Sequence, residues 1–265
     1  MAQPPVLRVG AAVVFVVVGA VGFLPLFGGP GYEHALASGL VVPSAAAIAA
    51  ALEASRREET PLDSVRRGAV WGLELALVAY ATSLLHGLRV GICDFWGGTV
   101  LFVLTAGVGS VMGGVWGAVV APLARGRRRR RLACVLLALA GPLAGVVLSV
   151  VRFYGSPAVF AYDPFFGYFS GTLYDTVVDT RPELWTYRAG SLLTLSGVSL
   201  VASGWPPSTT GGARARLGLG SLALVASLLH CASGPELGHW ETASSIARQL
   251  GGRSSGGRCD VLHSD

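Results

Sequence analysis

Long apolar stretches dominate the pattern of hydrophobic and polar positions along the chain. About 17 to 25 such residues let a helix cross a hydrocarbon layer of about 30 Å. Seven stretches qualify: Val6–Phe27, His34–Ala54, Gly68–Leu88, Gly97–Ala124, Leu132–Val151, Ala189–Trp205 and Leu217–Ser233. Lipid offers backbone groups no hydrogen-bond partners, and the short alternating segments of a β-barrel do not occur, so these spans must be helices. The pattern predicts an all-α membrane protein with seven transmembrane helices.

Composition agrees with a membrane location. Hydrophobic residues make up 52% of the 265 residues and charged residues only 13%, about half the charge of an ordinary soluble domain. This excludes a water-soluble globule and a disordered chain. All 20 basic residues are arginine, which is typical of a GC-rich genome, and we expect the inner (plasma) membrane of a bacterium. The first stretch is too long for a typical signal-peptide core and is expected to be retained.

The arginines predict the orientation of the chain. With a cytoplasmic N-terminus, 13 arginines and four acidic residues lie on the cytoplasmic side, against seven arginines and ten acidic residues opposite. Short cytoplasmic loops carry the excess of positive charge in membrane proteins. Residues 1–233 are therefore expected to form a polytopic membrane domain, and residues 234–265 an extracytoplasmic tail, which reads as a linker or as the start of a further domain.

One connection, residues 152–187, is unusually long and aromatic. It contains 11 of the 23 aromatic residues, and loops of this length in compact domains tend to be functional. Turn residues around Pro164, Gly167 and Gly171 predict a folded cap or a re-entrant piece. The candidate contacts to a substrate or partner are Tyr162, Asp163, Phe165, Phe166, Tyr168, Asp175 and Asp179. The alternative is an interfacial belt of aromatic rings.

Histidines suggest a second candidate site. All five lie at or beyond the predicted outer surface, and imidazole and carboxylate groups are suitable ligands for zinc or a similar metal. A metal site would combine His34, His86 and His230 with Asp163. The chain has no HxxH, HExxH or CxxC spacing, so no motif requires a cofactor. The alternative is a set of unrelated histidines at the membrane interface.

Glu74 is the one acidic residue inside a predicted span. Ionisable groups at such depth usually face the interior of a helix bundle and serve a function. The alternative is that Glu74 reaches toward Arg66 or Arg67 at the inner interface.

Cysteines and glycines suggest two structural features. Cys93 and Cys259 both fall on the predicted outer side, where an oxidising compartment could bridge them; a Cys93–Cys231 bridge and free thiols are the alternatives. Glycines recur every four residues in two predicted spans, a spacing that lets membrane helices approach closely. These glycines are Gly109, Gly113, Gly117, Gly141 and Gly145.

Three classes of function remain open. The first is a membrane anchor, scaffold or sensor that presents the aromatic loop and the tail outside. The second is a transporter or channel component that uses Glu74 and the glycine-rich fourth span, and the third is a metal-dependent enzyme with the histidine–carboxylate site. The chain has no phosphate-binding loop, dinucleotide fingerprint or GxSxG motif, and no lysine for a retinal Schiff base. Expected partners are the lipid bilayer and a second copy or another membrane subunit, but no nucleic acid.

Overall fold

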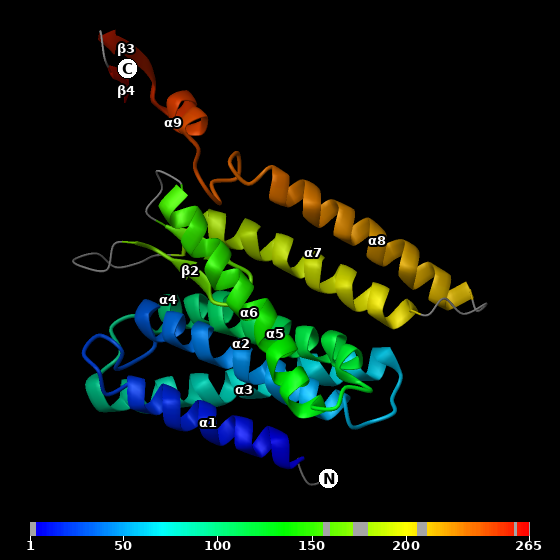
Figure 1. The fold of residues 1–265 in the computed structure, drawn as a ribbon. Coiled ribbons are helices and arrows are strands. Elements are labelled where there is room, and N and C mark those ends of the chain that lie inside the picture. The colour runs from blue at the N-terminus through cyan, green and yellow to red at the C-terminus, as the bar shows by residue number, and fades with distance from the viewer. Residues whose placement is uncertain (1–3, 156–159, 172–179, 206–210, 257–258, 265) are drawn as a thin grey trace.

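Helices form most of the structure, a computed structural model that describes residues 4–155, 160–171, 180–205, 211–256 and 259–264 (Figure 1). The long helical segments are α1 (Pro5–Val21), α2 (Tyr32–Ala54), α3 (Pro61–Val90), the continuous helix Phe95–Ala124, α6 (Arg130–Gly155), α7 (Pro182–Gly204) and α8 (Gly211–Ala232). Five of the described helices, all of these except α1 and α7, are long and apolar enough to cross a membrane. The chain is thus an all-α protein with several membrane-spanning candidates.

Local sequence signals explain where several helices begin and end. Thr60 caps the start of α3 by accepting a hydrogen bond from the Asp63 N–H, and Pro61 occupies the first helical position, where its missing N–H costs nothing. Asp94 accepts from the Gly97 N–H in the same way at the next helix. α3 ends at Gly91, whose φ of +92° is readily adopted only without a side chain.

The helix Phe95–Ala124 changes its winding along its length. It consists of α4 (Phe95–Phe102), the π-helical turn η1 (Val103–Gly107), α5 (Val108–Val120) and the 3₁₀ turn η2 (Ala121–Ala124). A single π turn inside an α-helix often marks a functional site. Here the turn lies against the aromatic connection and against α7.

Small residues hold the centre of the bundle together. α5 packs between α2 and α3. A Cβ on Gly113 or Gly117 would collide with the carbonyl oxygens of Pro43 or Ala47 on α2, and Gly114 lies equally close to Gly68 on α3. Close approach of helix backbones is the usual packing mode in lipid, so these glycines join α5 to its two neighbours.

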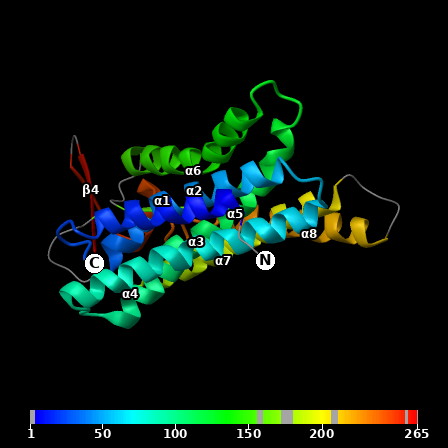
Figure 2. The same ribbon diagram turned by 90° about the horizontal axis from the view of Figure 1, so that it is seen from below.

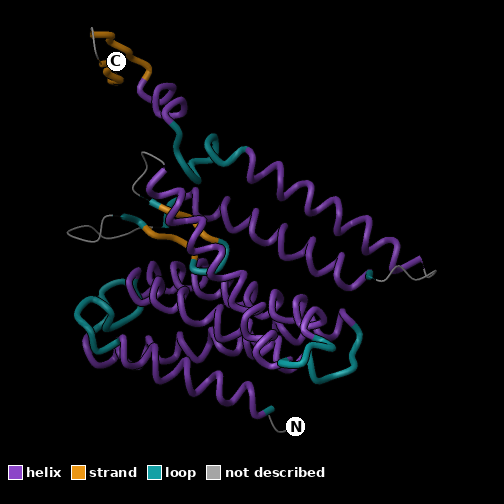
Figure 3. The backbone as a smooth tube through the Cα atoms, in the orientation of Figure 1, coloured by secondary structure: helices purple, strands orange, loops and turns teal. Residues whose placement is uncertain are grey.

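The aromatic connection enters the bundle instead of lying across its end. α6 continues to Gly155 and α7 begins at Pro182, so both helices extend into the loop expected at residues 152–187. Between them, β1 (Ala161–Asp163) and β2 (Gly167–Phe169) form an antiparallel hairpin (Figure 3). Tyr162 pairs with Tyr168 in it. We call residues 161–169 the re-entrant hairpin.

Three glycines receive the re-entrant hairpin. A Cβ on Gly39 of α2 would collide with the Phe166 carbonyl, one on Gly109 of α5 with the Phe165 carbonyl, and one on Gly145 of α6 with the Asp163 carboxyl group. Gly39 is seven residues from Tyr32, Gly145 ten from Gly155 and Gly109 fourteen from Phe95. At 1.5 Å per residue, the hairpin therefore lies about 10 to 21 Å from those helix ends, measured along the helix axes into the bundle.

The last two long helices form a separate layer. α7 and α8 pack mainly on each other, and α7 also contacts α3, α5 and η1. Figure 2 shows α6 on one side of α2 and α5, with α7 and α8 on the other. Beyond α8, the short helix α9 (Ala243–Leu250) and the hairpin of β3 (Gly251–Gly256) and β4 (Cys259–Ser264) extend away from the bundle. The predicted tail therefore contains secondary structure of its own.

Candidate functional site

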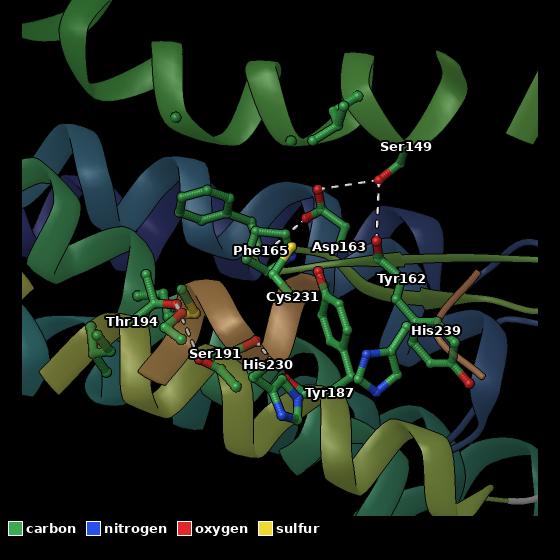
Figure 4. Close-up of a pocket in the computed structure, with 18 of the residues that line it drawn as sticks. Ser149, Tyr162, Asp163, Phe165, Tyr187, Ser191, Thr194, His230, Cys231 and His239 are labelled. Atoms are coloured by element: carbon green, nitrogen blue, oxygen red, sulfur yellow. Dashed lines mark hydrogen bonds between the residues drawn. The ribbon is translucent and has the colours of Figure 1, made fainter. Parts of the chain in front are cut away.

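A pocket of about 450 Å³ lies between α5, α6, α7, α8 and the re-entrant hairpin (Figure 4). Away from the hairpin its lining is mostly apolar and includes Met112, Val115, Trp116, Leu195 and Val198. The hydroxyl groups in this part, on Ser191, Thr194 and Ser227, are hydrogen-bonded to the backbone of α7 or to one another. Its upper end, near the hairpin, carries Ser149, Arg152, Tyr162, Asp163, Tyr187, His230, His239 and Trp240. The twelve residues from Tyr187 to Val198 rise about 17 Å along α7. The site is therefore elongated, with one polar and one apolar end.

The pocket opens on the outer surface of the helix layer. Leu148 on α6 and Leu228 on α8, which line it from two sides, are 49% and 70% exposed. In contrast, Val115 on the α5 wall is only 3% exposed. The pocket thus leads from an exposed apolar face to the interior of the bundle.

Asp163 shapes the turn at the polar end. Its Oδ1 accepts hydrogen bonds from the N–H groups of Phe165 (2.7 Å) and Phe166 (2.8 Å), and Ser149 donates to its Oδ2 over 3.4 Å. The carboxyl group is fully buried. Burial raises the pKa of Asp163 above its ordinary value, although the hydrogen bonds and the charge of Arg188 oppose this rise. The residue works mainly as the cap of the hairpin turn.

Arg188 connects α7 to the hairpin and to the π turn. Its guanidinium donates to the carbonyl oxygens of Leu104, Pro164 (2.8 Å) and Thr105 (3.2 Å). The side chain is 2% exposed, so these acceptors replace the water that the charge has lost. One buried side chain thereby fixes three elements that are distant in sequence.

A row of aromatic and imidazole rings in contact joins the start of the tail to this site. The ring centroids follow one another at 4.8 Å (Tyr168–Tyr162), 5.2 Å (Tyr162–Tyr187), 5.2 Å (Tyr187–His239) and 5.3 Å (His239–His230). His239 is 3% exposed, and its Nε2 lies 2.9 Å from the Thr186 hydroxyl. Trp240 follows and also lines the pocket, against Arg152. The tail therefore covers the polar end.

This cover is expected to loosen in acid. Burial, and to a smaller extent the neighbouring His230, lowers the pKa of His239 from 6.5 to about 4, although Glu183 opposes the shift. Because the docked form excludes the charged ring, docking is complete above pH 6.5 and weakens as the pH falls toward 4. In protein labelled with 5-fluorotryptophan, the ¹⁹F resonance of Trp240, assigned with Trp240→Phe, should shift over this interval. His239→Phe keeps a ring without a titrating proton and should abolish the shift; a shift that persists in this variant would contradict the prediction.

The structure does not bring the four expected metal ligands together. His34 contacts the Phe27 carbonyl through Nδ1 at 3.0 Å, and His86 lies against Gly22 and the ring of Phe23. His230 lies elsewhere, against Gly190, and Asp163 caps the hairpin. Among the described residues, no group of three or more His, Cys, Asp or Glu side chains could hold a metal.

Glu74 lies outside the pocket. It is half-buried on α3, and its Oε2 has no hydrogen-bond partner within the described part of the chain. Of its two expected neighbours, Arg67 pairs instead with Glu59 at 2.6 Å.

The other candidate residues lie in different parts of the structure. Tyr162, Phe166 and Tyr168 are buried in the re-entrant hairpin, whereas Asp175 and Asp179 lie outside the described residues. Cys93 is a free, exposed thiol, as is Cys231, so the structure has no Cys93–Cys259 bridge. Gly141 lies against the indole of Trp116.

Several residues of the site were not singled out from the sequence. These are Ser149, Arg152, Tyr187, Arg188, His239 and Trp240. Arg188 comes directly before an apolar stretch, and the sequence alone places it among the outer arginines. His239 follows His230 by nine residues. Because His230 lies at the end of a predicted span and His239 shortly after it, this short separation was the one signal in the sequence that the two rings could meet.

Comparison of the chain with protein-family models, characterised proteins and solved structures finds no match. A function for the chain therefore has to be inferred from the geometry of the site.

Proposed function

We propose that the chain crosses a membrane seven times, with its N-terminus in the cytoplasm. The apolar helix α1 has 17 residues and spans about 26 Å, and α7 pairs along its length with α8. Arg125 donates to the carbonyls of Ala54 and Arg57, which places two arginine-rich loops at one end of the bundle. A cytoplasmic position for this end follows the positive-inside bias.

In this orientation the pocket is a binding site for a lipid-sized amphipathic molecule of the outer leaflet, and the chain acts as a membrane-embedded lipid-binding or sensor protein. The observation that carries the proposal is that Arg152, Asp163, the tyrosines and the histidines gather at one end of an elongated pocket, whose other end is lined mostly by apolar side chains. Its volume of about 450 Å³ falls within the range of about 300 to 1,000 Å³ for small-molecule sites. Since Leu148 and Leu228 are exposed, the molecule enters sideways from the membrane.

Of the three classes of function, this arrangement best supports a sensor. The tail covers the polar end through His239 and Trp240, so occupancy of the pocket is coupled to the position of the segment outside the membrane. Transport through Glu74 and metal catalysis at the histidines remain the alternatives, and neither is favoured by a specific contact.

Filling the pocket tests the proposal. Leu195 lines the apolar part, whereas its neighbour Leu192 is 48% exposed and does not line the pocket. The wild-type protein is placed in nanodiscs that contain a phospholipid with a diazirine at the end of one acyl chain. On illumination this lipid should become attached to the protein at the buried Val115. Leu195→Trp should reduce this labelling about tenfold, equivalent to about 1.4 kcal/mol of affinity, and Leu192→Trp should not. Equal labelling of Val115 in both variants would refute a lipid site here.

A further inference from the structure

Arg152 is the cation at the polar end of the pocket. It lies on α6, one turn before the helix ends at Gly155, and its guanidinium lies 4.5 Å from the centre of the Trp240 ring. Salt bridges within the described residues all lie at the opposite end of the bundle, between Arg57 or Arg67 and the carboxylates of Glu53 and Glu59. Arg152 thus lines the pocket without an ion pair to any carboxylate in the described part of the chain.

Two other polar side chains that line the pocket with Arg152, Ser149 and His230, can donate hydrogen bonds. The Ser149 hydroxyl lies one turn deeper on the same face of α6, and its one proton is shared between two distant acceptors in the hairpin, the Tyr162 carbonyl and Asp163 Oδ2, each 3.4 Å away. The Nε2 atom of His230 is buried without a hydrogen-bond partner in the described chain. A buried polar atom in this condition costs free energy unless a ligand or water satisfies it. The polar end therefore offers one positive charge and further donors to an incoming group.

The carboxyl group that lines the pocket does not cancel this preference. Asp163 lines the pocket, but its Oδ1 is already used by the N–H groups of Phe165 and Phe166. Its burial also favours the neutral acid, which repels an anion less than a carboxylate would. Glu183, which faces His239, does not line the pocket.

We propose that the polar end binds the phosphate group of an outer-leaflet glycerophospholipid, with Arg152 as the main contact and Ser149 as a second donor. The planar guanidinium donates two parallel hydrogen bonds to phosphate oxygens, and Trp240 holds it in place through the cation–π contact. The acyl chain occupies the apolar part of the pocket. This inference rests on the proposed lipid site and specifies its headgroup chemistry.

The experiment compares two lipids with identical acyl chains and a terminal diazirine. Phosphatidylglycerol carries the phosphate, and diacylglycerol lacks it. Wild-type protein should label at Val115 about tenfold more efficiently with phosphatidylglycerol. Arg152→Gln should reduce phosphatidylglycerol labelling about tenfold and leave diacylglycerol labelling unchanged. Arg181→Gln is the matched control, because Arg181 is an exposed arginine at the same end of the bundle and does not line the pocket.

Each alternative gives a different result. If Arg152→Gln labels with phosphatidylglycerol as well as wild type does, while keeping its thermal unfolding midpoint, the phosphate contact is refuted and the lipid site stands. If neither lipid labels Val115 in the wild type, the proposed function itself fails. If inorganic phosphate at millimolar concentration abolishes phosphatidylglycerol labelling, the site recognises free phosphate and the lipid assignment is overturned.

Discussion

Replacement of Arg188 by methionine is expected to separate α7 and α8 from the rest of the bundle. Methionine has a similar length but cannot donate to Leu104, Thr105 and Pro164, whose carbonyls accept from the guanidinium. Hydrogen bonds to charged groups contribute about 1.5–3 kcal/mol each, and buried acceptors left unpaired add a penalty. The free energy of unfolding should therefore fall by about 3 kcal/mol or more, measured by denaturant titration in detergent micelles.

Two further variants serve as controls for the Arg188→Met substitution. Arg181→Met removes an exposed arginine near the start of the same helix and should change stability by less than about 0.5 kcal/mol. Arg188→Lys keeps the charge but loses the planar fork that reaches several carbonyls at once, so its stability should be intermediate. Wild-type stability in Arg188→Met would show that α7 is held by its other contacts.

Replacement of Gly109 by alanine is expected to displace the re-entrant hairpin. The new Cβ would collide with the backbone carbonyl oxygen of Phe165, and backbone atoms cannot rotate away as a side chain can. Overpacking of this kind costs about 1–3 kcal/mol. Hydrogen–deuterium exchange should become faster at residues 161–169, whose strand pairing depends on their position between the helices.

Gly218 provides the matched control for this substitution. It lies in α8, and a Cβ there would meet nothing within 4 Å. Gly218→Ala should therefore leave exchange in the hairpin unchanged and stabilise α8 slightly, because alanine favours helix by about 0.5–1 kcal/mol. Equal exchange rates at residues 161–169 in the Gly109→Ala and Gly218→Ala proteins would mean that the hairpin does not depend on the space left by the missing side chain of Gly109.

The helical segments could be predicted from the sequence because lipid imposes a length and a composition on each one. Positions 34–54, 68–88 and 132–151 all lie within helices of the structure. Turn residues around Gly167 likewise indicated a folded piece in the aromatic connection. Both signals are local, so neither depends on knowing which segments meet in space.

The site itself depends on contacts between distant segments. Gly109 and Gly145 belong to regular glycine spacings that predict helix packing, but in the structure they receive the hairpin instead. Arg188 gives no sign in the sequence that it finds carbonyl acceptors more than 80 residues away, in the π turn. His230 was grouped with His34 and His86 by membrane side alone, whereas its neighbour is His239.

The order of the elements along the chain has a consequence for biosynthesis. A chain emerging from the ribosome folds from its N-terminal side, so α2, α5 and α6 are present before α7 is made. The recess at Gly39, Gly109 and Gly145 can therefore accept the hairpin before Arg188 arrives to fix it. Assembly then ends with the two helices that close the pocket, which leaves its apolar walls in contact with membrane lipid until translation is complete.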